Sequence, residues 1–135
     1  MPATFALDIV TPEKTVLSET ATSVQLPAAD GSLGILAGHA PLLAELGVGE
    51  CIVKTASGAE EVYALAGGFV EVSRERVTIL ADTAEHASEI DLTRAEEALT
   101  RAREMVTRVD GSSDPDEVNA AIRRAQARIR IARGS

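Results

Sequence analysis

Apolar and polar residues alternate along the first part of the chain, which is the pattern of half-buried β-strands. Phe5, Leu7 and Ile9 fall on one side of an extended segment, with Asp8 on the other side. Further strand-like runs lie at residues 22–26, 50–55, 61–65, 69–72 and 77–81. Turn residues separate the runs at Thr11-Pro12, Asp30-Gly31, Ser57-Gly58 and Gly67-Gly68. Short strands at this spacing, with no helical period among them, predict an antiparallel β-sandwich or flattened barrel over residues 1–84.

The period of the apolar positions then changes. Two stripes recur at intervals of three and four residues, as on one face of a helix: Leu92, Ala95, Leu99, Ala102, Val106 and Val109, followed by Val118, Ala121, Ile122, Ala125 and Ile129. Asp91 is placed to cap the first helix, residues 110–113 to end it, and Asp114-Pro115 to start the second. Residues 91–135 are therefore predicted to form an antiparallel two-helix hairpin, with residues 85–90 as a hinge. The fold class is α+β.

Charge and composition narrow the class of partner. The 135 residues carry a net charge of −8 and include only three aromatic side chains, Phe5, Tyr63 and Phe69. Residues 1–88 hold 12 acidic and four basic side chains, whereas residues 89–135 hold nine of each, and every basic residue there is arginine. An acidic protein with so few rings is poorly suited to phosphate backbones and to base stacking, which argues against nucleic acid as a partner.

Catalytic and metal sites are not indicated. The two histidines, His39 and His86, have no neighbours at metal-ligand spacing, and the single cysteine, Cys51, cannot form an internal disulfide, which favours a reducing compartment. The glycine-containing run at residues 30–34 lacks the Gly-Lys-Ser/Thr ending of a phosphate loop and is interpreted as turns. No secretory signal and no apolar run long enough to cross a bilayer is recognisable, so membrane association is expected only through another protein.

Arginines on the hairpin form a candidate anion site. Arg124 and Arg128 are four residues apart and stand one above the other on the second helix, while Arg94 lies one turn from the start of the first. In an antiparallel hairpin the start of one helix lies near the end of the other, so these three guanidinium groups can converge on a polyphosphate. Spacing alone favours the simpler interpretation, which is solvated helix faces.

Several segments resemble a known family. Residues 34–43 (GILAGHAPLL), 67–72 (GGFVEV) and 77–81 (VTILA) are similar to the epsilon subunit of bacterial F-type ATP synthases, which is called delta in mitochondria. The similarity covers essentially the whole chain. One departure is Ala37, where the family usually has proline, and it affects a single loop.

The resemblance implies a place in a rotary complex. The sandwich would sit at the foot of the rotor, against the gamma subunit and the ring of c subunits, with Ser32, Gly38 and His39 facing these partners. The hairpin would alternate between a compact form on the sandwich and an extended form that enters the catalytic α/β ring and blocks ATP hydrolysis. In the extended form, Arg123 and Arg130 would meet an acidic segment of β. The expected location is the cytoplasmic face of the cell inner membrane, as a peripheral subunit.

Some members of this family bind ATP as a regulatory ligand, through an Ile/Leu-Asp-x-x-Arg-Ala motif and two arginines of the second helix. Residues 90–95 (IDLTRA) match that motif completely. By resemblance, the nucleotide-binding residues are Glu85, Ile90, Asp91, Arg94, Arg124 and Arg128. The agreement with the arginine spacing now favours ATP binding over solvated faces. The alternative to a role in the rotary complex is a free-standing adaptor whose hairpin binds a partner helix.

Overall fold

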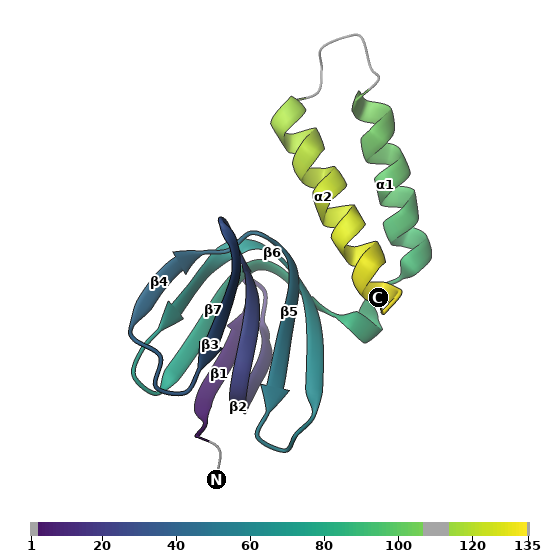
Figure 1. Ribbon diagram of the computed structural model, residues 1–135. Helices are drawn as coiled ribbons and strands as arrows, with labels where there is room; N and C mark the ends of the chain where they lie inside the picture. The colour runs from purple at the N-terminus through teal and green to yellow at the C-terminus, as the bar shows by residue number, and fades with distance from the viewer. Residues whose placement is uncertain (1–2, 107–113, 135) are drawn as a thin grey trace.

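The computed structural model describes residues 3–106 and 114–134. Strands are followed by a short 3₁₀ turn and two helices, which confirms the predicted α+β order (Figure 1). The elements are β1 (Phe5–Val10), β2 (Thr15–Ala28), β3 (Gly31–Leu36), β4 (Leu42–Glu45), β5 (Val48–Thr55), β6 (Glu60–Val72), β7 (Arg76–His86), η1 (Ala87–Glu89), α1 (Leu92–Val106) and α2 (Pro115–Ala132). Glu85 and His86, placed in the hinge by the sequence, are the last residues of β7.

The strands close into a flattened barrel. Pairing runs β1-β7-β6-β5-β2, and β2 pairs back onto β1, with β3 added beside β2 and β4 beside β6. The pairs are antiparallel as predicted, except that β1 and β7 are parallel, from Ala6 beside Arg76 to Val10 beside Leu80. A ring of five strands cannot alternate in direction all the way round, so one neighbouring pair has to run parallel.

The interior of the barrel is built from alternate strand positions. Phe5, Leu7 and Ile9 are buried in β1, which confirms the period-two prediction, and Val53, Leu65 and Ile79 continue the same core. Cys51 also lies inside it, and burial raises the pKa of its thiol to about 12. The interpretation of Cys51 as a small core residue is therefore confirmed.

Gly67-Gly68 is not a turn between strands, so the turn predicted there is wrong. The strand β6 runs through both glycines, pairing with β5 as far as Ala66 and with β4 from Phe69 onward. A side chain at Gly68 would place its Cβ 2.0 Å from the Leu80 carbonyl oxygen. The two glycines thus let one strand pass from one partner to another while staying close to β7. Two short strands, β3 and β4, were missed.

The helices begin where their capping residues predict. The Asp91 carboxylate accepts a hydrogen bond from the Arg94 backbone N–H at 3.1 Å, and Asp114 caps α2 with Pro115 in its first turn. Val109 and the predicted end of the first helix lie outside the described residues. Val106 was predicted on the buried stripe but is 58% exposed, because it lies at the end of α1 farthest from the sandwich (Figure 1).

Contact between hairpin and sandwich is made by α2, which packs on β5, β6 and η1, while α1 packs on α2. This contact includes a small buried apolar cluster of Ala64, Ile90 and Ile131, bordered by Val62, Ala87 and Ala132. It is separate from the barrel core. Neither described helix is long and apolar enough to cross a membrane.

Candidate functional site

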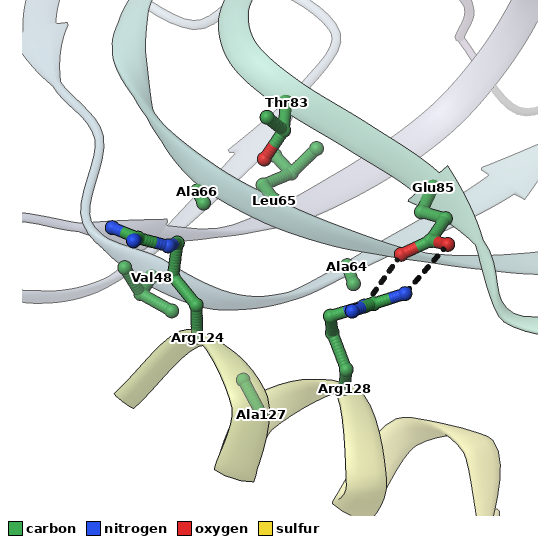
Figure 2. A pocket seen from close by; sticks show the side chains of 9 residues that line it. All are labelled: Val48, Ala64, Leu65, Ala66, Thr83, Glu85, Arg124, Ala127 and Arg128. Carbon is green, nitrogen blue, oxygen red and sulfur yellow. Dashed lines mark hydrogen bonds and ion pairs between the residues drawn. The ribbon is translucent and has the colours of Figure 1, made fainter. Parts of the chain in front are cut away.

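A cleft opens between the end of β7 and the two helices, α1 and α2. Its volume is about 300 Å³, at the small end of the range for ligand sites. We refer to it as the arginine cleft; its lining consists of Thr83, Glu85, Ala98, Ala121, Arg124, Ala125 and Arg128. A cavity of about 40 Å³ shares Thr83, Glu85, Arg124 and Arg128 with it and reaches inward to Val48 and Ala64. Figure 2 shows both arginines projecting from α2 toward the strands, with Glu85 facing Arg128.

Arg128 and Glu85 make a two-pronged ion pair. The Arg128 Nε lies 2.8 Å from one carboxylate oxygen of Glu85, and Nη2 lies 3.1 Å from the other (Figure 2). Arg124, one turn earlier, has Nη2 at 3.2 Å from Glu117 within α2. About a third of the Arg128 and Glu85 side chains is exposed, so the pair is open to competition from a solute anion.

The predicted nucleotide-binding residues divide into two groups. Glu85, Arg124 and Arg128 line the arginine cleft. The proximity of Arg124 and Arg128 was predicted from helix spacing, whereas Glu85 was singled out only by the family resemblance. Ile90 packs against Ile131, and Asp91 caps α1, so neither lines the cleft. Arg94 does not line it either, because the start of α1 lies beside the end of α2, as the ion pair between Glu96 and Arg133 indicates. Arg124 lies nine residues before Arg133, which places it about 13 Å along the helix axis from the level at which α1 starts.

Two lining residues were missed by sequence reasoning. Thr83 lies two positions before Glu85 on β7 and therefore on the same face of the strand. Ala98 follows Arg94 by four residues and lies on the same side of α1. Both could have been found by extending the period of the strand and of the helix from the residues already singled out.

His86 holds the junction between β7 and η1. Its Nε2 lies 2.5 Å from Glu61 Oε2, and its Nδ1 accepts a hydrogen bond from the Ser88 backbone N–H at 3.1 Å. The ring of Tyr63 meets the imidazole edge-on at 5.0 Å between centroids. Across the described parts of the chain, no group of three metal-ligating side chains is present. Through its contacts with Glu61, Ser88 and Tyr63, His86 joins β6, the end of β7 and η1.

Tyr63 gives a pH prediction at this junction. Burial, reinforced by the negative charge of Glu61, raises the pKa of Tyr63 from 10.0 to about 12. Between these two pH values the Tyr63 hydroxyl has lost its proton in the unfolded chain and keeps it in the folded chain. The free energy of unfolding that this group contributes below pH 10 is therefore lost as the pH rises toward 12, by at most about 1.4 kcal/mol per pH unit. Chemical denaturation at pH 9 to 12 should show this decline. Tyr63→Phe should make it shallower, and an unchanged slope in that variant would contradict the assignment.

Comparison with known proteins identifies the family. Residues 4–87 match the model of the ATP synthase delta/epsilon chain β-sandwich domain, and residues 88–133 match the long α-helix domain of the same chain. The chain belongs to the ATP synthase delta/epsilon family. It is 47% identical to the ATP synthase epsilon chain of Desulfitobacterium hafniense, with 98% of this chain and 99% of the relative covered. It is 44% identical to that of Solibacter usitatus, with 98% of each chain covered.

Solved structures agree with this assignment to the delta/epsilon family. A chain in the mitochondrial ATP synthase of Euglena gracilis, solved as an OSCP/F1/c-ring assembly, is 25% identical and superposes with a TM-score of 0.83. The match covers 94% of this chain and 80% of the Euglena chain. A chain from the central stalk and c-ring of the Tetrahymena thermophila enzyme, at 16% identity, covers 96% and 94% with a TM-score of 0.58 and shows the shared fold. As an epsilon-family subunit of ATP synthase, the chain is non-catalytic.

The residues that the delta/epsilon resemblance assigns to rotor partners lie on the sandwich surface. Ser32 is exposed on β3 and accepts a hydrogen bond from the Gln25 side-chain amide at 3.1 Å. Gly38 and His39 follow β3 in a turn, where the His39 backbone N–H bonds to the Leu36 carbonyl at 3.1 Å. Nearby on the surface, Leu36 is 66% exposed.

The two arginine edges of α2 differ in surroundings. Arg124 and Arg128 are half-buried at the arginine cleft, whereas Arg123 and Arg130 are exposed. In this family member, the edge predicted to meet nucleotide therefore faces the sandwich, and the edge predicted to meet the catalytic ring faces solvent.

Proposed function

We propose that this epsilon-family chain is a rotor component that couples the catalytic sector of an F-type ATP synthase to its c-ring. Its sandwich binds the gamma subunit and the c-ring, and its hairpin regulates hydrolysis at the α/β subunits. Family membership supports this role, as does the close superposition on a chain solved in an F1/c-ring assembly. The attachment to the membrane is through the complex, on the cytoplasmic face.

Exposed apolar side chains supply the surface for rotor partners. Leu36 and Leu43 are 66% and 67% exposed beside the turn that carries Gly38 and His39, and Phe69 and Leu80 are 50% and 48% exposed as cross-strand partners on β6 and β7. Large apolar groups left in water on a small domain are typical of interaction surfaces.

Regulation depends on weak docking of the hairpin. Few large side chains join α2 to the sandwich, and each contributes at most about 1.5–3 kcal/mol when fully buried, while alanine contributes far less. A docked state of this kind can exchange with an extended one that reaches the catalytic ring. A ligand that binds only the docked form at ten times its dissociation constant adds about 1.4 kcal/mol, enough to shift such a balance.

The ligand of the docked state is ATP, held at the arginine cleft. The observation that carries this proposal is the convergence of Arg124 and Arg128 from α2 with Glu85 from β7 on one open cleft of about 300 Å³. Guanidinium groups match phosphate oxygens in charge and geometry. Because the cleft has walls on both domains, a bound triphosphate would join them.

Calorimetry on the isolated subunit tests the nucleotide site. Arg128→Ala should weaken ATP binding by about 10- to 100-fold, the loss expected for one charge-assisted hydrogen bond. Arg123→Ala, on the opposite edge of α2, is the matched control and should bind as the parent does. Equal affinity of Arg128→Ala and the parent would remove the nucleotide role.

An alternative function as an adaptor is supported by exposed apolar side chains at the outer end of the hairpin. There Met105 and Val106 are 37% and 58% exposed. A partner helix could pack there. Co-purification separates the two functions, because a rotor component recovers gamma and the α/β ring, whereas an adaptor recovers a different protein.

A further inference from the structure

The ion pair between Arg128 and Glu85 joins two separate parts of the fold. Its partners are 43 residues apart, one on α2 and one on the penultimate residue of β7. Two other ion pairs made by arginines at α2 stay within the hairpin, namely Arg124 with Glu117 and Arg133 with Glu96. The Arg128–Glu85 pair instead acts between the hairpin and the sandwich.

The Arg128–Glu85 pair has the bidentate geometry that makes arginine–carboxylate pairs strong. Two roughly parallel N–H···O bonds, at 2.8 and 3.1 Å, occupy both carboxylate oxygens of Glu85 and the Nε and Nη2 of Arg128. The buried apolar cluster between the two parts is small, with Ala64, Ile90 and Ile131 as its members. A two-pronged ion pair therefore adds to a contact that contains few large apolar side chains.

The same guanidinium serves the proposed nucleotide site. With its Nε and Nη2 directed at Glu85, Arg128 reaches a phosphate with those donors only when the carboxylate moves aside. Glu85 thus stands where an anionic ligand would otherwise neutralise Arg128. In the absence of ligand, the protein's own carboxylate completes the charge balance of the cleft.

We infer that Glu85 and Arg128 form a clasp that keeps the hairpin on the sandwich without any nucleotide, and that an anionic ligand takes over Arg128 from Glu85 when it binds. The inference rests on the proposed movement of the hairpin. Its consequence is that the docked form is populated before ATP arrives, so ATP strengthens an existing state.

The test uses the full chain, free of nucleotide, with probe pairs introduced by Ala59→Cys on the sandwich and Asn119→Cys on α2, both of which are exposed positions. Cys51 is buried and should escape labelling. Distances between the probes report the docked and undocked populations. Glu85→Gln and Arg128→Gln should each raise the undocked-to-docked ratio about three- to tenfold. This effect is smaller than that of a fully buried bidentate pair, because the side chains are one-third exposed and solvent screens their attraction.

The exchanged pair, Glu85→Arg with Arg128→Glu, should return that ratio to within about threefold of the parent, because it restores the attraction in reverse. Arg101→Gln, at an exposed position of α1 outside the arginine cleft, is the matched control and should leave the ratio unchanged. The clasp is refuted if neither single variant shifts the distances, or if the exchanged pair docks no better than the single variants.

Calorimetry on the same variants separates the clasp from the nucleotide role. The exchanged pair should dock normally yet bind ATP weakly, since a carboxylate then replaces the arginine of α2. Should the parent bind no ATP while the exchanged pair still restores docking, the clasp stands and the nucleotide role fails.

Discussion

Removing residues 89–135 should raise the ATP hydrolysis rate of the reconstituted synthase about five- to tenfold at low ATP. That increase corresponds to abolishing an inhibited population favoured by about 1–1.4 kcal/mol. The physical reason is that the proposed inhibitor is the hairpin itself. In the assembled complex its contacts with the catalytic ring compete with its docking on the sandwich, which the Glu85–Arg128 clasp supports without making it permanent. The measurement compares complexes assembled with the full chain and with the shortened chain.

The shortened chain should still fold and bind. The closed strand ring keeps its own core, in residues such as Leu7, Val53 and Ile79, whereas the hairpin packs on the separate cluster around Ile131. Equal recovery of gamma and c-ring with both chains is therefore the required control. Unchanged hydrolysis in a complete complex would remove the inhibitory role.

A finer variant locates the inhibition on the hairpin. Replacing Arg123 and Arg130 by alanine in the full chain should relieve much of the inhibition and leave ATP affinity unaltered, because both lie on the exposed edge of α2. Loss of ATP binding in this variant would contradict the division of labour between the two edges.

The elements that were predictable from sequence share a simple property: one physical cause determines them locally. Strand β1 alternates because only one of its faces is buried, and the helix starts follow from Asp91 and Asp114. By contrast, Gly67-Gly68 has the composition of a turn, and its role as a crossing point between β5 and β4 depends on long-range pairing. The parallel β1–β7 pair likewise follows from closure of the ring, which no local pattern contains.

The candidate site shows the same division. Arg124 and Arg128 share a helix face, so their proximity follows from spacing alone, and Glu85 reaches them because β7 continues to His86. Placing Arg94 required the register between two helices, which depends on how the side chains of α1 and α2 pack against each other. The contact between Glu85 and Arg128 was also beyond reach, since it requires the position of α2 on the sandwich.

Gly68→Ala should destabilise the chain by about 3–5 kcal/mol, among the largest effects of any single substitution. At φ +107° the backbone already disfavours an L side chain, and the added Cβ would lie 2.0 Å from the Leu80 carbonyl oxygen and 2.8 Å from the Ala81 Cα. Both are backbone atoms of the paired strand, so relief requires β6 and β7 to separate. Chemical denaturation measures the loss.

Gly58→Ala is the matched control, because Gly58 has a similar φ of +95° and nothing within 4 Å of the added Cβ. It should lose only about 1–2 kcal/mol, the backbone cost without the collision. If the two variants lose the same stability, close approach of β6 to β7 is not what Gly68 provides. If Gly68→Ala loses more, the close approach of β6 to β7 is what excludes a side chain at this position, next to the pair of exposed neighbours, Phe69 and Leu80, on the surface proposed for rotor partners.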